Sequence, residues 1–432
     1  MLGLTLRRAG PAQASETRRW LTVAAKVKAI NRVRGTRDLL ADDSQQHRAV
    51  LDVLQRTVER YGFRSIQTPL LEYTDLFSRS LGDGSDIVMK EMYTFNDNSG
   101  KSVTLRPEGT VGIMRALVSN NLMFSLPHKV SYSGSMFRYE RPQRGRYREF
   151  QQFGVEFVGS TGPSVDAEVY FVMLLGESCC YSELMQTGVV ISLQVIAMAT
   201  DALNSLGIKS KVVLELNSLG DSESLERGSV LRILDSKSEI DQKIIVDAPQ
   251  LSDFLSEESR MRFDNVLGGL DALGITYRHN PRLVRGLDYY SNTVFEFIEQ
   301  PASDAPSTEG ATVGGIAVLA GGCYDGLAES LGGPATACVG WAAGVDRLNL
   351  LREKPTESIR SVAVIPVLAG DNSNHVLHEA MRVAQAAERY GSTHAVILGG
   401  AEIDQQIVKV KNLDKREETQ VSMEELESFE FH

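Results

Sequence analysis

Five arginines lie between residues 138 and 148 of this chain, around the turn-forming run RPQRG at residues 141–145. The planar guanidinium of arginine can donate paired hydrogen bonds to phosphate or carboxylate oxygens. The segment therefore predicts a site for a polyanion, and a solvated arginine-rich hairpin is the alternative interpretation of the same composition.

The residues after this turn alternate in polarity, which is typical of a β-strand. Phe153, Val155 and Phe157 occupy odd positions, whereas the even positions carry polar residues, glycine and one phenylalanine. We expect a half-buried strand whose odd face packs in the core and whose even face is functional. Residues 136–140 align in the same way before the turn, so residues 141–145 would close an antiparallel hairpin.

Three further regions carry residues of the same chemical kinds. TLRPEGT (residues 104–110) places an arginine, a carboxylate and a hydroxyl at a predicted strand-to-helix corner. LVRGLDYY (residues 283–290) brings an arginine and two tyrosines in front of a strand predicted at residues 293–297. The last region comprises AGGCYDGLAESLGG (residues 320–333) and CVGWAAGVDRL (residues 338–348), which ends with an arginine on a predicted helix.

In this order the segments resemble class II aminoacyl-tRNA synthetases, specifically the histidyl-tRNA synthetase family, over most of residues 30–430. The general class features are SIQTPLLE around Pro69, FRYE with Arg138 and GVDR with Arg347. TLRPEGT and LVRGLDYY are more specific to the histidine family. The resemblance implies activation of histidine with ATP and magnesium to histidyl-adenylate, followed by transfer to histidine tRNA.

The sequence also indicates how ATP would be held. The chain has neither a G-x-x-x-x-G-K-[ST] loop nor a G-x-G-x-x-G run that opens a helix, so arginines must offset the phosphate charge. Arg138 and Arg285 are expected, by the resemblance, to flank the α-phosphate and to act in catalysis. Phe150 either offers a flat surface for adenine or packs in the core. The residues expected to bind ATP are Arg138, Arg146, Phe150, Arg285 and Arg347.

The resemblance also implies a histidine pocket. An α-ammonium group requires a carboxylate, and Glu156 with Gln152 can reach one ligand from one strand face. An imidazole carries one donor and one acceptor, so its selection needs groups of both kinds. The positions that match the family's histidine contacts are Glu108, Gly109, Thr110, Gln152, Glu156, Tyr289, Tyr290 and Tyr324.

In this family the hairpin turn faces the acceptor stem of the tRNA. Gln143 both donates and accepts hydrogen bonds and can read a base edge, whereas Arg141 and Arg144 suit phosphate. The net charge of −11 argues against general affinity for nucleic acid, so the contact with tRNA is expected to be local.

The cysteine spacing and the apolar runs bear on the cellular compartment and on membrane association. Cys179, Cys180, Cys323 and Cys338 show no C-x-x-C spacing, which argues against a metal site or a disulfide framework and fits a reducing compartment. No apolar run is long enough to span a membrane. The segment around Pro69 implies a homodimer by the resemblance.

Residues 1–28 have the composition of an organelle transit peptide. Four arginines stand against Glu16 alone before residue 20, and apolar residues recur at helical spacing. We expect a mitochondrial location, and a plastid address or an ordinary basic extension on a cytoplasmic protein is the alternative.

The predicted organisation has two folded parts. By the same resemblance, residues 29–350 are expected to form an α+β catalytic domain with a mixed, mainly antiparallel sheet flanked by helices. Within it, residues 219–278 are expected to form a helical insertion, with its clearest helix at residues 256–274. Residues 351–360 indicate a charged linker. Residues 361–432 predict a small C-terminal α/β domain, which in the family binds the anticodon stem.

The chain departs from the family pattern in four places. Residues 174–194 have no counterpart, the insertion is short near residues 228–230, and the C-terminal domain is shortened near residues 390–393. Cys323 stands where the family usually has arginine. An alternatively spliced product and lineage-specific remodelling both account for such changes.

Some paralogues keep this fold without the chemistry, as regulatory subunits of ATP phosphoribosyltransferase or as RNA-sensing domains. Such paralogues tend to lose charged catalytic positions first. Here Arg138, Arg285, Arg347, Glu108 and Glu156 are all present. The sequence therefore favours the ligase, and the regulatory or sensing role is the alternative.

Overall fold

The computed structural model describes residues 30–82, 85–159, 187–221, 251–300, 315–352, 362–367, 394–412 and 417–425. The chain divides into two compact units, residues 1–352 and 353–432. The predicted transit peptide, most of the predicted linker and the predicted gaps near residues 228 and 391 lie outside the described residues, as do residues 174–186 of the stretch without a counterpart.

The first unit is built on an eight-stranded sheet with the order β1-β5-β6-β11-β10-β9-β7-β8. The two edge pairs, β1–β5 and β7–β8, are parallel, and every inner pair is antiparallel. The predicted mixed, mainly antiparallel sheet flanked by helices is confirmed. Its strands are β1 (Arg64–Ser65), β5 (His128–Phe137), β6 (Glu149–Val158), β7 (Val212–Ser218), β8 (Arg278–His279), β9 (Ser291–Glu299), β10 (Ala317–Cys323) and β11 (Cys338–Gly344).

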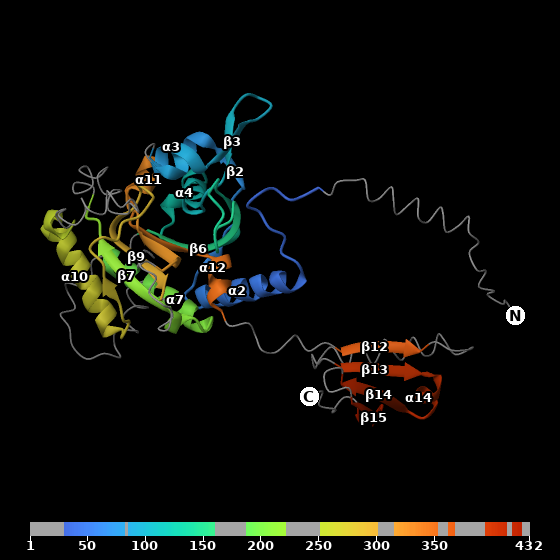
Figure 1. Cartoon of the computed structure of the whole chain (residues 1–432). Coiled ribbons are helices and arrows are strands. Elements are labelled where there is room, and N and C mark those ends of the chain that lie inside the picture. The colour runs from blue at the N-terminus through green and yellow to red at the C-terminus, as the bar shows by residue number, and fades with distance from the viewer. Residues whose placement is uncertain are drawn as a thin grey trace, which may run out of the picture. The chain divides into compact units, whose positions relative to one another are not determined.

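Helices cover both faces of this sheet (Figure 1). On one face α2 (Ala41–Arg60), α7 (Thr187–Ser205), α10 (Glu257–Ala272) and α12 (Val345–Leu351) share a core with the odd-numbered residues of β6. On the other face α3 (Thr74–Leu81), α4 (Thr110–Ser119) and α11 (Leu327–Ser330) share a second core with β5. Shorter turns lie at Ile87–Glu91, Leu122–Phe124, Lys209–Lys211 and Leu251–Phe254.

Helix α10 lies within residues 256–274, where the sequence predicts the clearest helix of the insertion. Ser256 caps it, because the Ser256 hydroxyl accepts a hydrogen bond from the backbone N–H of Ser259 at 3.1 Å. Glu257 and Glu258 follow in the first turn, where carboxylates oppose the positive end of the helix dipole.

The loop of the β5–β6 hairpin is longer than the sequence predicts, because it spans residues 138–148 and not 141–145. β5 ends at Phe137, so Arg138 and Glu140 lie beyond the strand. Gln143 and Arg146 exchange backbone hydrogen bonds, and Gly145 takes the left-handed φ of +69° that this tight turn requires.

The expectation that β6 is half-buried is wrong for its second part, because residues 153–158 are buried on both faces. On the even face, Gly154 lies directly opposite Tyr132 in the register, and the tyrosine ring covers it. Glu156 is only 1% exposed. The functional face of the strand is therefore the floor of a cavity and not a solvent-facing surface.

A three-stranded sheet lies beside the main one, with the order β2-β4-β3. Its strands are β2 (Leu71–Tyr73), β3 (Tyr93–Asn96) and β4 (Ser102–Leu105), and β4 leads through the predicted corner into α4. In Figure 1 the β3–β4 turn projects from the top of the unit.

The second unit contains a four-stranded sheet in which the pair β12–β13 is parallel and the remaining pairs are antiparallel. In its described part, the C-terminal domain predicted as α/β contains these strands and one short helix. The elements are β12 (Val362–Val367), β13 (His394–Gly399), α14 (Gly400–Asp404), β14 (Ile407–Asn412) and β15 (Glu418–Ser422). Within the described part of the chain, every helix is too short or too polar to cross a bilayer.

Candidate active site

A cavity of about 1700 Å³ collects residues from all the motif segments. Ligand pockets commonly have volumes of about 300–1,000 Å³, so this one has room for more than one small molecule. Of the residues predicted for the site, Gly109 and Arg141 do not line the cavity. Those that line it are Glu108, Thr110, Arg138, Gln143, Arg144, Arg146, Phe150, Gln152, Glu156, Arg285, Tyr289, Tyr290, Tyr324 and Arg347.

Glu156 is the buried carboxylate on the cavity floor. The hydroxyl of Thr110 donates to its Oε1 at 2.7 Å, and the hydroxyl of Tyr324 donates to its Oε2. Burial raises the pKa of Glu156 to about 8, although both hydroxyl hydrogen bonds act in the opposite direction. Only glycine fits at Gly340, since a Cβ there would lie 1.9 Å from Oε2. The site therefore holds a desolvated carboxylate suited to pair with a cation.

Glu108 serves the corner before α4. Its carboxylate accepts hydrogen bonds from the backbone N–H groups of Thr110 and Val111, each at 2.8 Å. Burial raises the pKa of Glu108, and these backbone hydrogen bonds oppose the effect. The hydroxyl of Tyr289 lies 3.5 Å from Oε2 of the same carboxylate. Glu108 thus fixes the helix start and keeps one oxygen near the tyrosines.

Three tyrosines form one wall of the cavity. The ring centroids of Tyr289 and Tyr290 lie 4.7 Å apart, and those of Tyr289 and Tyr324 lie 5.7 Å apart at an edge-to-face angle of 68°. Gln152 lies on the same strand face as Glu156, and its buried Oε1 has no hydrogen-bond partner among the described residues. A flat polar ring and an ammonium group would find matching partners here.

Tyr132 was not predicted for the site, and it packs beside residues of the cavity without lining it. It is 4% exposed and lies against Gly154, where a Cβ would meet its ring at 2.4 Å. A Cβ at Gly109 would meet the same ring at 2.2 Å. Gly109 therefore makes room for Tyr132 and does not line the cavity. The signal is a tyrosine paired with a glycine across two strands, which is visible only once the register is known.

The hairpin arginines differ in what they contact. Arg138 donates from Nε to the carbonyl oxygen of Pro107 at 2.9 Å, and its guanidinium lies 5.5 Å from the centre of the Phe150 ring. Glu140 pairs with Arg146 at 3.2 Å and lies 3.8 Å from Arg138. These contacts hold two arginine forks and one aromatic face at the same edge of the cavity.

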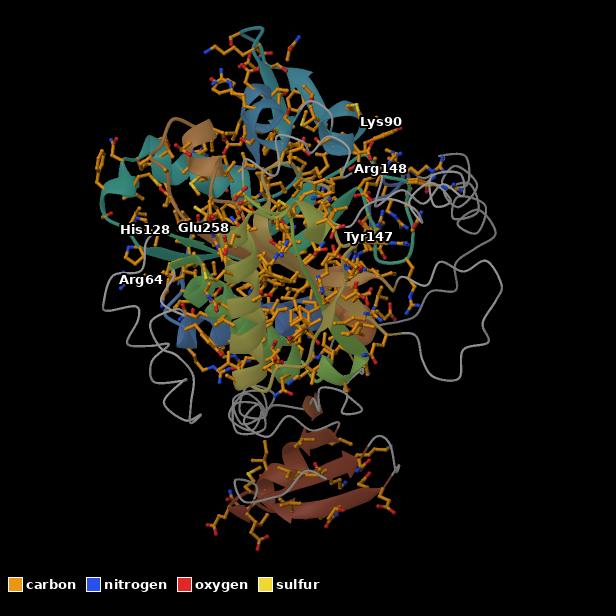
Figure 2. The ribbon with its side chains drawn as sticks, turned by 90° about the vertical axis from the view of Figure 1, so that its left-hand side faces the viewer. Arg64, Lys90, His128, Tyr147, Arg148 and Glu258 are labelled. Carbon is orange, nitrogen blue, oxygen red and sulfur yellow. The ribbon has the colours of Figure 1, made fainter. Side chains whose placement is uncertain are left out.

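Arg148 belongs to the scaffold of the hairpin. Its guanidinium lies 3.7 Å above the ring of Tyr139, and its Nε donates to the carbonyl oxygen of Glu140 at 3.3 Å. Figure 2 shows Tyr147 and Arg148 on the side of the unit opposite His128, where β5 begins. The length of β5 thus carries the arginine-rich turn to one end of the sheet.

Arg347 connects three segments at the cavity. Its guanidinium donates to the carbonyl oxygen of Ala317 in β10 at 2.6 Å and to that of Gly145 in the hairpin turn at 3.3 Å. Burial, followed by the nearby charge of Arg146, lowers the pKa of Arg347 to about 10. Arg347 is therefore still positively charged at neutral pH and lies where an anion would enter.

Arg285 pairs with Glu296 of β9, and its guanidinium lies 5.4 Å from the centre of the Tyr290 ring. Glu296 was not predicted for the site, although a lone carboxylate in the apolar strand TVFEF was a usable signal. Glu296 lies opposite Glu215 of β7, which pairs with Arg278. Two opposed carboxylates are thus each neutralised by an arginine.

The predicted contacts to tRNA lie at the end of the hairpin. Gln143 and Arg144 are exposed at the mouth of the cavity, and Arg141 is exposed outside it. Across the described ranges, no three side chains of His, Cys, Asp or Glu come together as a metal site.

Comparisons with known proteins agree with this arrangement. Residues 35–348 match the family model described as Histidyl-tRNA synthetase. A histidine–tRNA ligase from Gluconobacter oxydans is 40% identical, and the match covers 91% of this chain and 96% of that protein. The crystal structure of apo histidyl-tRNA synthetase from S. aureus matches with a TM-score of 0.66 at 30% identity, covering 93% of this chain and 99% of that chain.

A solved structure titled as an ATP phosphoribosyltransferase regulatory subunit/histidyl-tRNA synthetase from Bacillus halodurans also matches. Its TM-score is 0.59 at 18% identity, and the match covers 87% of this chain and 94% of that one. This likeness shows a shared fold alone.

Proposed function

This chain belongs to the histidyl-tRNA synthetase family, and from that premise we propose that it is a histidine–tRNA ligase that forms histidyl-adenylate and transfers the histidyl group to histidine tRNA. The observation that carries the proposal is the buried Glu156, held by Thr110 and Tyr324 beside a wall of tyrosines. The arginines needed for ATP lie in the same cavity.

In the first step the histidine carboxylate attacks the α-phosphorus of ATP, and pyrophosphate leaves. Glu156 and Gln152 would hold the α-ammonium group, so that the carboxylate points along the cavity toward Arg138 and Arg285. These guanidiniums would stabilise the negative charge that develops on the α-phosphate oxygens. Arg347 and Arg146 suit the distal phosphates because both line the cavity near the hairpin turn.

In the second step the terminal ribose hydroxyl of the tRNA attacks the acyl carbon of the adenylate, and AMP leaves. The cavity opens at the exposed Gln143 and Arg144, which suit a base edge and a phosphate respectively. Burial of the tyrosine wall keeps water from the acyl group.

Magnesium fits this site as an ion that enters with ATP. Mg²⁺ commonly binds one or two carboxylates and substrate phosphates, and it keeps several waters. Glu140 pairs with Arg146 and lies 3.8 Å from Arg138, so it could supply one ligand. When bound, the ion would offset charge on the phosphates.

Histidine-dependent exchange of pyrophosphate into ATP tests the proposal. The whole chain should exchange with histidine and not with other amino acids, and it should charge histidine tRNA. A folded protein without histidine-dependent exchange would replace this proposal with the regulatory or sensing role.

We also propose that the chain forms a homodimer through the three-stranded sheet and the segment before it. Leu70, Leu71, Tyr73 and Phe95 are exposed large apolar side chains there, and Pro69 beside them is exposed. Light scattering should give twice the chain mass, and Leu71→Asp should shift the protein toward monomer. A monomeric parent chain would contradict the proposal.

A mitochondrial location stays a prediction from residues 1–28. A fluorescent protein carrying residues 1–35 should enter mitochondria, and its arginine-to-glutamine variant should not.

Anticodon recognition by residues 361–432 also stays a prediction. Charging of histidine tRNAs with altered anticodons by the whole chain would test it.

A further inference from the structure

An ion pair joins the insertion helix α10 to the turn that carries Tyr324. Nη1 of Arg262, in α10, lies 3.2 Å from Oδ2 of Asp325, the residue that follows Tyr324. The two side chains are only 17% and 29% exposed. Such a half-buried pair is shielded from solvent more than a surface pair, so it can hold its geometry.

Asp325 connects this pair to two strands of the main sheet. Its Oδ1 accepts a hydrogen bond from the backbone N–H of Cys338 at 2.9 Å, and its Oδ2 lies 3.4 Å from Nδ2 of Asn292. The backbone N–H of Tyr324 donates to the carbonyl oxygen of Cys338 at 2.9 Å. The carboxylate therefore fixes the turn against the starts of β9 and β11.

This turn positions Tyr324, which forms part of the histidine pocket. Tyr324 is 1% exposed, and its hydroxyl donates to Glu156. A shift of about 1 Å in a substrate-positioning group can lower a rate a hundredfold. The placement of Tyr324 consequently depends on the carboxylate of Asp325 and on the cation that holds it.

Cys323 packs against the same guanidinium. It is fully buried, and its Sγ lies 3.5 Å from Nη2 of Arg262. A longer side chain at position 323 would enter the space of this guanidinium. A thiol cannot neutralise Asp325, so the cation in contact with this carboxylate comes from Arg262.

We infer that Arg262 is a positioning residue for the histidine pocket, whose guanidinium, delivered by the insertion helix, holds the carboxylate of Asp325 and through it the turn that carries Tyr324. The inference rests on the proposed function, since it assigns a role within the histidine site. It also makes the histidine pocket of this chain dependent on α10.

Histidine-dependent exchange with purified full-length variants tests this inference. Arg262→Ala should raise the KM for histidine about tenfold, with a much smaller change in the KM for ATP. Arg260→Ala is the matched control, because Arg260 is exposed on the same helix and does not line the cavity. Its Nη2 donates to the carbonyl oxygen of Ser252 at 3.2 Å. The control variant should leave both constants unchanged.

Moving the charge provides the second arm of the experiment. Cys323→Arg alone should impair histidine binding, since two guanidiniums would compete for one carboxylate. Combined with Arg262→Ala, it should recover most of the loss. An inactive parent chain would refute the proposed function, whereas an active parent with an unaffected Arg262→Ala would refute only this inference. A loss in Arg262→Ala that affects ATP and histidine equally, without recovery by Cys323→Arg, would reduce Arg262 to a general stability role.

Discussion

The hydroxyl of Thr110 donates a hydrogen bond of 2.7 Å to Oε1 of Glu156, across 46 positions of sequence. The bond joins the strand-to-helix corner before α4 to the strand after the arginine-rich turn. It places the start of α4, the cavity floor and the tyrosine wall at one point. Changes of pH and variants of the residues around this bond test the properties of the pocket.

Histidine binding should depend on the titration of Glu156. Burial raises the pKa of Glu156 to about 8, so in the free site this carboxyl is mostly protonated at neutral pH. An ammonium group needs the carboxylate, and binding should therefore release a proton. The KM for histidine should fall as the pH rises from 6.5 toward 8.

The same shift has a consequence for stability. Between its ordinary pKa of 4.5 and about 8 the folded state holds a proton that the unfolded state lacks, so the free energy of unfolding should fall as the pH rises through this range.

Calorimetry of histidine binding in buffers of different ionisation enthalpy would count the protons that Glu156 releases when histidine binds. Glu156→Gln should release about one proton fewer than the parent chain, and equal proton release in both would contradict the assignment.

Replacing Arg285 should affect the transition state more than substrate binding. Arg285→Ala should lower kcat for adenylate formation by about a hundredfold or more, with a smaller change in the KM for histidine. Arg285→Lys should restore little, because a point charge cannot reproduce the fork geometry. Pre-steady-state measurement of adenylate formation checks both, and an unchanged kcat would remove Arg285 from catalysis.

Gln143 should matter for tRNA and not for ATP. It is exposed at the turn, whereas Arg138, Arg285 and Arg347 are partly buried. Gln143→Ala should impair aminoacylation and leave tRNA-independent pyrophosphate exchange nearly intact. Arg144→Ala should weaken tRNA use in a salt-dependent way. An equal loss of both activities in Gln143→Ala would mean that the turn shapes the ATP site.

Gly340 should be intolerant of any side chain. A Cβ there would lie 1.9 Å from Oε2 of Glu156 and 2.5 Å from the carbonyl oxygen of Val155. Gly340→Ala should displace the carboxylate, raise the KM for histidine and destabilise the fold by about 1–3 kcal/mol. Gly344→Ala on the same strand is the control, because its Cβ would lie 3.6 Å from the nearest atoms, in Arg347. Similar thermal midpoints and KM values for both variants would contradict this.

His47 should make the first unit sensitive to acid. Burial, helped by the charge of Arg37, lowers the pKa of His47 to about 4. Arg37 lies 2.6 Å from its Nε2, which fits a neutral ring. Between pH 6.5 and 4 the unfolded state binds a proton that the folded state does not, so stability should be lost as the pH falls through this range. Thermal midpoints should fall less in His47→Gln, and parallel pH curves would exclude His47 as the cause.

Much of the fold could be predicted because it depends on local patterns. The period-two alternation of Phe153, Val155 and Phe157 identified a core face, and the turn before it was identified from glycine and proline. The helical pattern at residues 256–274 predicted α10, and the cap at Ser256 was found in the structure. The sheet type came from the family resemblance and not from these patterns.

The sequence by itself determined which side chains the cavity could hold, because motif residues lie at the ends of elements whose starts and turns are set by their neighbours in the chain. The tertiary structure decided which of these residues meet. Tyr132 against Gly154, Glu296 beside Arg285 and Arg262 on Asp325 are all contacts between different elements. Strand register selects such contacts, and a shift by one residue would turn every side chain to the other face of the sheet. No local pattern contains that register, since it is set by the packing of both cores at once.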